Sequence, residues 1–313
     1  MNPLAEIIHH QKVLVLDGAL ATELERAGAD LHDPLWSAKV LLEQPELIKK
    51  VHADYFSAGA DCVITASYQA SFEGFAQRGL NQVQAAELMR LSVRLAIEAR
   101  DEFWAQPGNR TNRMRPLIAA SVGPYGAYLA DGSEYRGNYG LNMTELMDFH
   151  RPRLSVLAET EADLIACESI PSFIEAQALT HLLSEFPQRL AWISFTAKDE
   201  SHISEGPPLV ECIQWLNDYP QIIAVGVNCT PPQFIPALVK AARSITDKAI
   251  VVYPNSGEGY SREDRTWLGG GGLGQYGQQA QDWYRCGANI IGGCCRTTPA
   301  EIRQVADWVR DPA

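Results

Sequence analysis

The sequence predicts an α/β protein that folds as a single (β/α)8 TIM barrel over residues 1–313, with extended loops after its strands. Short apolar segments recur along the chain, and each leads through a polar or glycine-containing tip into an amphipathic stretch. Eight such units follow one another with no domain-length break. Strands that alternate with helices form parallel sheets, and eight units suit a closed barrel, for which about 250 residues is typical.

Each unit supplies one strand and one helix in chain order. The apolar runs predict strands at residues 13–16, 62–65, 117–121, 163–167, 190–195, 222–227, 249–253 and 288–291. Helical periodicity between them predicts helices at residues 45–57, 82–102, 144–161, 172–185, 210–217, 233–244 and 275–286. A last helix is expected directly after Thr298, which can form a capping box with Glu301.

An open doubly wound sheet is the rival fold. It usually carries a G-x-G-x-x-G fingerprint after its first strand, and residues 17–22 read DGALAT, which does not match. Long loops follow four strands, at residues 17–44, 121–143, 196–208 and 254–274. Because the loops after the strands build the active site of a barrel, this extra length predicts substrate enclosure. The glycine run at 269–274 follows no strand, so it reads as a flexible loop rather than a phosphate cradle.

Composition narrows the class of ligand. The net charge is −12 and no basic run exceeds a pair of residues, which argues against nucleic acid and against anionic lipid. Residues 1–12 leave no signal-peptide core, and no apolar run approaches the roughly 20 residues that span a bilayer. Seven cysteines, mostly in apolar segments, indicate free or metal-bound thiols in a reducing compartment. We therefore expect a cytoplasmic protein that acts on small molecules, as a monomer or a small homo-oligomer.

Two cysteines at the end of the last predicted strand are the strongest chemical signal. Residues 288–299 read ANIIGGCCRTTP, so Cys294 and Cys295 follow an apolar strand and two glycines. Neighbouring strand residues point to opposite faces, and therefore adjacent thiols converge only where the strand ends and bends. The glycines at 292–293 are expected to supply the backbone freedom for that bend.

A second segment, residues 222–233, repeats this pattern and ends its strand at Cys229, with Thr230 and Gln233 as another candidate capping box. If both strand ends lie on one rim of the barrel, three thiolates form a metal site. The alternatives are small buried side chains or a strained vicinal disulfide. Three thiolates suit Zn²⁺ with a fourth position open. Such a complex activates water weakly but deprotonates a coordinated thiol, which favours a thiol substrate.

The other cysteines serve as a contrast. Cys62, Cys212 and Cys286 are interpreted as core or surface thiols, because none of them ends a strand. Cys167 lies at a strand end beside Glu168, where it is either part of the core or close to the metal.

Polar residues at the same rim suggest how a substrate is held. Asp17 and Glu168 each follow a strand, where a carboxylate forms a cap or a loop salt bridge, or grips a substrate ammonium group. Asn255 is a turn residue, or an amide that contacts the substrate or shields the zinc. Tyr125 and Tyr128 lie in a tyrosine-rich loop and either pack against the protein or face a cationic methyl donor.

Four segments together resemble the zinc-dependent homocysteine methyltransferase family: Asp17-Gly18, VNC at 227–229, PNSG at 254–257 and GGCCRTTP at 292–299. The resemblance implies a (β/α)8 barrel in which Cys229, Cys294 and Cys295 hold zinc. It also implies that the amino group of homocysteine lies near Asp17 and Glu168. Asn255 matches an asparagine close to the site of that family.

The resemblance also bears on the methyl donor. We expect no separate folate or cobalamin domains and no long C-terminal extension of the kind in betaine enzymes, so the chain looks most like the stand-alone enzymes with a sulfonium donor. S-methylmethionine is the first expectation and S-adenosylmethionine the second. Betaine is an alternative donor. A zinc-stabilised barrel with a non-catalytic binding role and a redox enzyme that uses Cys294 and Cys295 are alternative functions.

Overall fold

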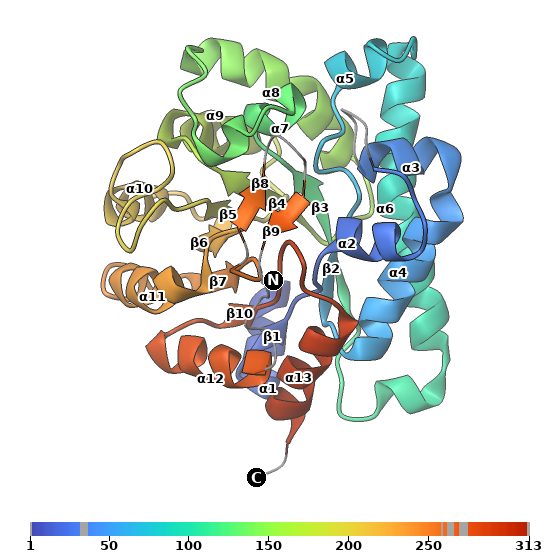
Figure 1. The fold of residues 1–313 in the computed structure, drawn as a ribbon, viewed down its shortest axis with the longest axis vertical. Coiled ribbons are helices and arrows are strands. Elements are labelled where there is room, and N and C mark those ends of the chain that lie inside the picture. Colours follow the sequence, from blue (N-terminus) through green and yellow to red (C-terminus); the bar gives the residue numbers. More distant parts are fainter. Residues whose placement is uncertain (1, 32–36, 258, 262–265, 269–274, 312–313) are drawn as a thin grey trace.

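Eight parallel strands form a barrel at the centre of the molecule (Figure 1). The computed structural model describes residues 2–31, 37–257, 259–261, 266–268 and 275–311. The barrel strands are β1 (Leu14–Val15), β2 (Cys62–Ile64), β3 (Leu117–Val122), β4 (Leu164–Ile170), β5 (Ala191–Phe195), β6 (Ile222–Asn228), β7 (Ala249–Tyr253) and β10 (Ile290–Ile291). Their order around the sheet is β1-β10-β7-β6-β5-β4-β3-β2.

The ring is closed between its first and second strands. The backbone N–H of Asp17 donates to the carbonyl of Cys62 over 3.1 Å, and that of Asp61 donates to the carbonyl of Val15 over 2.7 Å. Each of the eight predicted strands is present, within three residues at each end, and the (β/α)8 barrel is confirmed.

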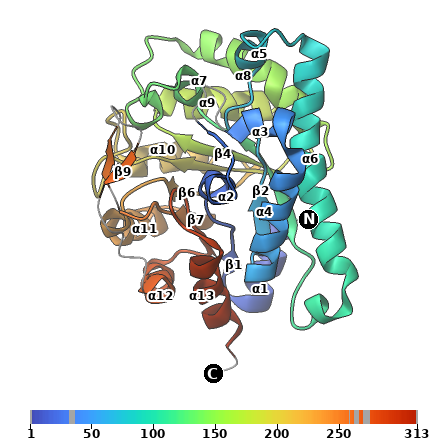
Figure 2. The ribbon, with the colours of Figure 1, turned by 45° about the vertical axis from the view of Figure 1, so that its right-hand side comes forward.

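Helices surround the strands (Figure 1). They are α1 (Pro3–Gln11), α2 (Leu20–Arg26), α3 (Ser37–Glu43), α4 (Pro45–Ala58), α5 (Phe72–Ala76), α6 (Gln82–Ala105), α7 (Tyr125–Leu129), α8 (Met143–Ala158), α9 (Phe173–Leu183), α10 (Leu209–Leu216), α11 (Ile235–Arg243), α12 (Tyr276–Cys286) and α13 (Pro299–Arg310), with short 3-10 turns η1 (Pro107–Arg110), η2 (Ser133–Tyr135) and η3 (Pro232–Phe234). All seven predicted helices and the helix after Thr298 are present. Figure 2 shows α4 and α6 side by side on the outside of the barrel.

The long loops carry structure that periodicity did not predict. The first contains α2 and α3, and the loop after β3 contains α7 and η2. The loop after β7 contains an antiparallel pair, β8 (Gly259–Ser261) and β9 (Thr266–Leu268). This hairpin lies in front of the strands in Figure 1 and stands clear of them in Figure 2. The expectation that no strand precedes the glycine run at 269–274 is wrong, because β9 ends at Leu268, and the run itself lies outside the described residues.

The core has two layers because every barrel strand is buried on both faces. Alternate residues such as Leu164 and Ala166 face the barrel interior, whereas Ile165 and Cys167 pack between the strands and the helices. At Gly226, an added Cβ would lie 1.9 Å from the carbonyl oxygen of Val251, so close packing excludes any side chain there. Helix α1 adds to the interior layer through Leu4 and Ile7, which are fully buried.

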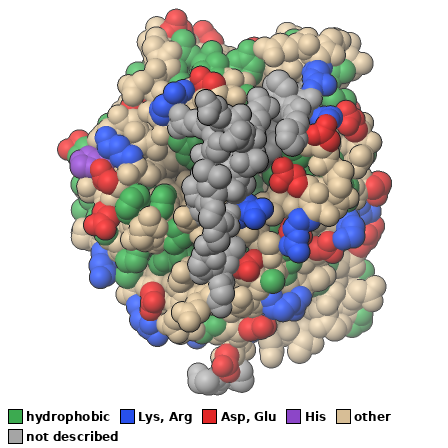
Figure 3. Space-filling model, in the orientation of Figure 1, with side chains coloured by type: hydrophobic (Ala, Val, Ile, Leu, Met, Phe, Trp, Pro, Cys, Tyr) green, Lys and Arg blue, Asp and Glu red, His purple; other side chains and the backbone are tan. Residues whose placement is uncertain are grey.

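The surface agrees with the acidic composition. The chain has 38 acidic and 26 basic residues, and on the described part of the face in Figure 3 the two kinds are intermixed rather than gathered in one basic patch. Of the helices in the described ranges, none is long and apolar enough to cross a membrane.

Candidate metal and substrate site

Cysteines from two remote segments meet at the ends of two barrel strands. Cys229 follows β6, and Cys294 and Cys295 follow β10, with β7 between these two strands in the sheet. The Sγ atom of Cys295 lies 3.8 Å from that of Cys229 and 4.0 Å from that of Cys294. Cys229 and Cys294 are joined as a disulfide, with their Cα atoms 5.5 Å apart. The three Sγ atoms therefore share one place, all within 4.8 Å of one another.

Backbone hydrogen bonds to the end of β7 hold this cluster together. The N–H of Cys229 donates to the carbonyl of Tyr253 over 3.1 Å, and the N–H of Cys294 donates to that of Pro254 over 2.8 Å. The N–H of Ser256 donates to the carbonyl of Cys295 over 3.1 Å. One strand tip thus fixes both cysteine segments.

The two glycines before Cys294 are needed for close packing, which corrects the expectation that they supply backbone freedom. An added Cβ would lie 2.4 Å from the Leu16 Cβ at Gly292, and 2.1 Å from the Thr297 Oγ1 at Gly293. Neither glycine has a left-handed φ. In the two cysteine segments, residues 222–233 and 288–299, the left-handed positions are Cys229, with φ 45°, and Arg296, with φ 71°.

One of the two predicted capping boxes is present. The Thr298 side chain accepts from the backbone of the first turn of α13, and Glu301 accepts from the Thr298 N–H over 2.9 Å. The capping box predicted at Thr230 is wrong, because η3 begins without a side-chain cap. The Thr230 hydroxyl instead donates to the Asn228 carbonyl over 2.9 Å and accepts from the Ala197 N–H over 3.0 Å. It ties the end of β6 to the loop after β5.

Two of the three sulfur separations in the thiol cluster have the dimensions of a tetrahedral metal site. Zn–S bonds of about 2.3 Å place the sulfur atoms of such a site about 3.8 Å apart. Both separations that involve Cys295 agree with this value, whereas Cys229 and Cys294 must be reduced before both can act as thiolates. Burial raises the pKa of the Cys295 thiol to about 12, and a bound cation favours the thiolate. The cluster can therefore hold a metal ion.

Two buried carboxylates lie at the same end of the barrel. Asp17, 3% exposed, follows β1 and accepts from the Ile64 N–H over 2.9 Å. Glu168, 7% exposed, lies in β4 and accepts from the Ser121 hydroxyl over 2.5 Å. Burial raises the pKa of Glu168 to about 7, and burial first and the Glu168 charge second raise the pKa of Asp17 well above its usual value. An added positive charge would stabilise both carboxylates.

Asn255 takes the turn role that its sequence context suggests. Its Oδ1 accepts from the Gly257 N–H over 2.9 Å, and its Nδ2 lies 3.4 Å from the carbonyl oxygen of Cys229. The side chain thus borders the thiol cluster through the backbone of Cys229. Contact with substrate remains a prediction.

The tyrosines proposed for the donor pack against α8. The ring centroid of Tyr125 lies 5.6 Å from that of Tyr128 and 4.8 Å from that of Phe149, and Tyr139 completes the group at 5.4 Å from Tyr125. The Tyr128 hydroxyl accepts from the Gln77 amide over 3.1 Å. The rings therefore show the packing role, and the donor role of Tyr125 and Tyr128 remains a prediction.

Sequence reasoning missed two other tyrosines that contact the site. Tyr68 follows β2 and is hydrogen-bonded to the Ser169 side chain, and Tyr135 of η2 is hydrogen-bonded to the Cys295 side chain. Burial raises the pKa of both phenols, so both stay protonated and can donate. Tyr135 belongs to the same tyrosine-rich loop as Tyr125 and Tyr128, but no sequence pattern separates it from its neighbours.

The remaining cysteines lie away from the thiol cluster. Cys62 faces the barrel interior, Cys167 and Cys212 pack in the outer layer, and Cys286 is half-buried in α12. Cys167 is thus in the core, with its side chain directed to the helices. The alternative function as a redox enzyme uses Cys294 and Cys295 as the redox pair, whereas the disulfide in the structure joins Cys294 to Cys229.

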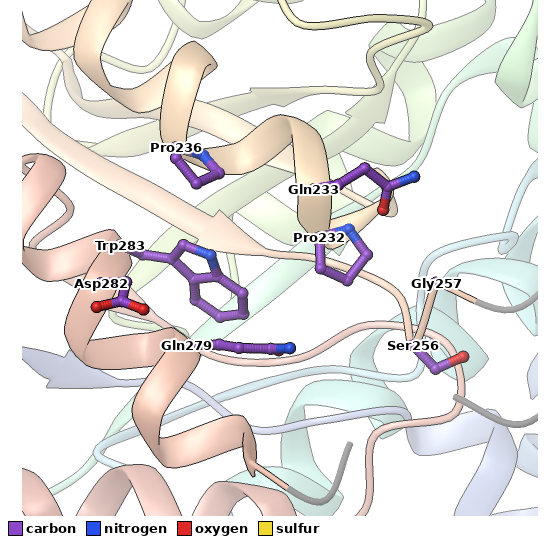
Figure 4. A pocket seen from close by; sticks show the side chains of 8 residues that line it. All are labelled: Pro232, Gln233, Pro236, Ser256, Gly257, Gln279, Asp282 and Trp283. Carbon is purple, nitrogen blue, oxygen red and sulfur yellow. The ribbon is translucent and has the colours of Figure 1, made fainter. Parts of the chain in front are cut away.

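A surface hollow of about 390 Å³ lies between α11 and α12, next to the end of β7 (Figure 4). Its lining residues are Pro232, Gln233, Pro236, Ser256, Gly257, Gln279, Asp282 and Trp283. Neither the three clustered cysteines nor the two buried carboxylates line it. It is therefore distinct from the candidate site.

Comparisons with known proteins give one consistent result. A family model described as homocysteine S-methyltransferase matches residues 14–309. The protein named homocysteine S-methyltransferase YbgG of Bacillus subtilis is 57% identical over 310 residues, which cover 99% of this chain and 98% of that protein. The metallated form of the homocysteine methyltransferase MmuM from Escherichia coli superposes with a TM-score of 0.88 at 46% identity, covering 98% of this chain and 100% of that chain. Its oxidized form gives 0.87 at 47% identity, covering 97% and 99%.

Proposed function

This chain belongs to the homocysteine S-methyltransferase family, and we propose that it transfers a methyl group from a sulfonium donor to the thiol of homocysteine, forming methionine. One observation supports this most: a cluster of three thiols and a pair of buried carboxylates occupy the same end of one barrel. The two groups match the two ends of an amino acid that carries a thiol.

The carboxylates Asp17 and Glu168 bind the ammonium group of homocysteine. No salt bridge joins either of them to a basic side chain among the described residues, and burial raises the pKa of both, so a ligand ammonium group would supply the positive charge that they lack. An ammonium group that enters between them replaces lost hydration and favours the charged form of both. Asn255 lies beside the thiol end of the substrate.

Cys229, Cys294 and Cys295 would hold Zn²⁺ through their sulfur atoms, and three protein ligands would leave the ion able to accept the substrate thiol. When bound, zinc favours the thiolate form of the homocysteine sulfur near neutral pH. The Tyr135 hydroxyl, which contacts Cys295, orients that ligand. The need for three reduced thiols supports a reducing compartment such as the cytoplasm.

S-methylmethionine is the proposed donor, and S-adenosylmethionine is the second choice. The homocysteine thiol loses its proton to solvent, and its sulfur forms a bond to the donor methyl carbon while the bond from that carbon to the sulfonium sulfur breaks. The electron pair stays on the leaving sulfur, which becomes neutral, so no general acid is required. With S-methylmethionine the products are two methionines. The rings of Tyr125 and Tyr128 supply faces for the positive sulfur.

The test is to assay methionine formation by the reduced, zinc-loaded chain from homocysteine with S-methylmethionine, S-adenosylmethionine and betaine side by side. Donors with an isotopically labelled methyl group show whether that group reaches homocysteine. We expect labelled methionine with S-methylmethionine at the highest rate. Faster turnover with betaine would reassign the donor, and no methionine from any donor would remove the proposal.

A zinc site with a purely structural role gives a different result. Cobalt in place of zinc reports its ligands through its absorption spectrum. If the fourth position accepts the substrate, homocysteine changes that spectrum. An unchanged spectrum would support the non-catalytic alternative.

A further inference from the structure

We propose that Asn228 is a positioning residue that sets the orientation of Glu168 by holding its neighbour Ser169 in a left-handed conformation. The inference rests on the proposed function, because it concerns the carboxylate assigned to the substrate ammonium group. Asn228 is the last residue of β6, Glu168 and Ser169 lie near the end of β4, and β5 runs between these two strands.

The end of β4 is irregular at the point where Glu168 is displayed. The pairing of β4 with β5 shifts register between Cys167 and Ile170. Ser169 lies within this shift and has φ 58°, a conformation that side chains other than glycine rarely adopt. A bulge of this kind inserts one extra residue and redirects the side chains around it. Ile170 consequently packs in the outer layer, as Cys167 does.

The Asn228 amide contacts Ser169 through both of its ends. Its Oδ1 accepts from the Ser169 N–H over 2.7 Å, and its Nδ2 donates to the Ser169 Oγ over 2.6 Å. Both residues are buried, Asn228 completely. Because the two bonds use opposite ends of the amide, they fix its orientation and the Ser169 backbone together.

The pair of hydrogen bonds between Asn228 and Ser169 has a rigid support in β5. The Ser194 hydroxyl donates to Asn228 Oδ1 over 2.8 Å and lies 2.6 Å from the Tyr253 hydroxyl. Tyr253 in turn accepts from the Trp192 indole over 3.2 Å. A left-handed non-glycine residue persists only where its surroundings fix it, and this buried network meets that condition at Ser169.

The effect of Asn228 should fall on the carboxylate rather than on the metal cluster. Cys229 keeps anchors that do not need the Asn228 side chain, since its N–H donates to the Tyr253 carbonyl. The Thr230 hydroxyl also donates to the backbone carbonyl of Asn228 and accepts from the Ala197 N–H. The Ser169 N–H, in contrast, donates to the Asn228 side chain itself. Loss of the amide therefore frees the Ser169 backbone that orients Glu168, leaving the carboxylate with the bond from the Ser121 hydroxyl, while the thiols stay in place.

The experiment compares Asn228→Ala with Asn217→Ala in the full, zinc-loaded chain. Asn217 is a matched control because it also forms two amide hydrogen bonds, to the Ile245 carbonyl and the Thr246 hydroxyl, at the end of α10 that precedes β6. We expect Asn228→Ala to raise the KM for homocysteine and the Kd for methionine about tenfold or more, with a smaller change in kcat and in zinc retention against a chelator. Asn217→Ala should lower only the Tm.

A second substitution tests the left-handed backbone directly. Glycine adopts positive φ without a Cβ penalty, so adding Ser169→Gly to Asn228→Ala should recover part of the lost methionine affinity. If Asn228→Ala does not fold, Asn228→Asp replaces it, since Asp has the same size and keeps the acceptor for the Ser169 N–H. It should show a smaller rise in KM.

The proposal would be wrong if Asn228→Ala changed the Tm alone, as its control does, or if Ser169→Gly brought no recovery. Failure of the unaltered chain to bind homocysteine or to form methionine has a different meaning, because that result would overturn the proposed function itself. The two failures are therefore distinguishable.

Discussion

The Sγ atoms of Cys229 and Cys295 lie 3.8 Å apart although 66 residues separate them in the chain. They meet because β6 and β10 both flank β7, whose tip is hydrogen-bonded to the segments on either side. The cluster is therefore a product of the closed barrel and not of a local sequence motif. Removing one thiol should damage the site without damaging the barrel that builds it.

Replacing Cys294 with Ser should abolish zinc retention and turnover while the barrel stays folded. A serine hydroxyl is a poor zinc ligand, and two thiolates leave the site incomplete. Metal content after dialysis and far-ultraviolet circular dichroism measure the two effects. Cys286→Ser is the control, because Cys286 lies half-buried in α12. A zinc-free Cys294→Ser protein with a normal rate would refute the proposed role of the cluster.

Glu168→Gln should weaken substrate binding without affecting the metal. The change removes the negative charge proposed to face the ammonium group, and a hydrogen bond to a charged group contributes about 1.5–3 kcal/mol, which corresponds to roughly a ten- to hundredfold rise in KM for homocysteine. Zinc content should match that of the unaltered chain. Glu185→Gln, at an exposed pair with Arg151, is the control. An unchanged KM in Glu168→Gln would place the ammonium group elsewhere.

The same carboxylate predicts how binding depends on pH. Burial raises the pKa of Glu168 to about 7, so the carboxyl loses its charge as the pH falls below that value. Binding of methionine, which has the ammonium group but no thiol proton, should therefore weaken between about pH 8 and about pH 6. Calorimetry measures the Kd at each pH. Glu168→Gln should flatten the dependence, and an equally steep dependence in that variant would assign it to another group.

Much of this architecture follows from the sequence for physical reasons. Parallel barrel strands are buried on both faces and therefore appear in the sequence as continuous apolar runs. These runs predicted the positions of all eight barrel strands. Strand tips of a barrel share one rim, so a cysteine after β6 and two after β10 could be expected to meet. These inferences need only the order of elements and the chemistry of their ends.

Other features depend on contacts that no local pattern records. Tyr68 and Tyr135 enter the site from loops whose paths are set by tertiary packing. The bulge at Ser169 is held by Asn228, 59 residues away. Thr230 has a capping sequence, but its hydroxyl is used by Asn228 and Ala197 instead. In each case a long-range hydrogen bond outweighs the local preference.

Gly293→Ala tests the close packing behind the cysteine pair. The added methyl group would lie 2.1 Å from the Thr297 Oγ1, whose hydroxyl donates to the Cys294 carbonyl over 2.6 Å. Overpacking of this kind costs about 1–3 kcal/mol and should shift the turn that carries Cys294 and Cys295. We expect weaker zinc retention against a chelator. Gly108→Ala, where an added Cβ meets no atom within 4 Å, is the control. Equal zinc retention in both variants would contradict the packing role.

Burial of His52 makes the stability of the chain depend on pH. Its ring in α4 is completely buried, neither ring nitrogen has a hydrogen-bond partner, and burial lowers its pKa to about 4. The unfolded chain takes up a proton near pH 6.5, which the folded chain does not do until about pH 4. The unfolded state thus binds more protons between these values, so the folded state loses stability as the pH falls through that range.

His52→Leu removes this dependence because leucine does not titrate. The free energy of unfolding of His52→Leu minus that of the unaltered chain should therefore be about 2 kcal/mol more positive at pH 5 than at pH 8. Urea unfolding at the two pH values measures the difference, and each variant serves as its own control for the change in packing, which is the same at both. An equal change in the free energy of unfolding at both pH values would show that a partner stabilises the charged ring.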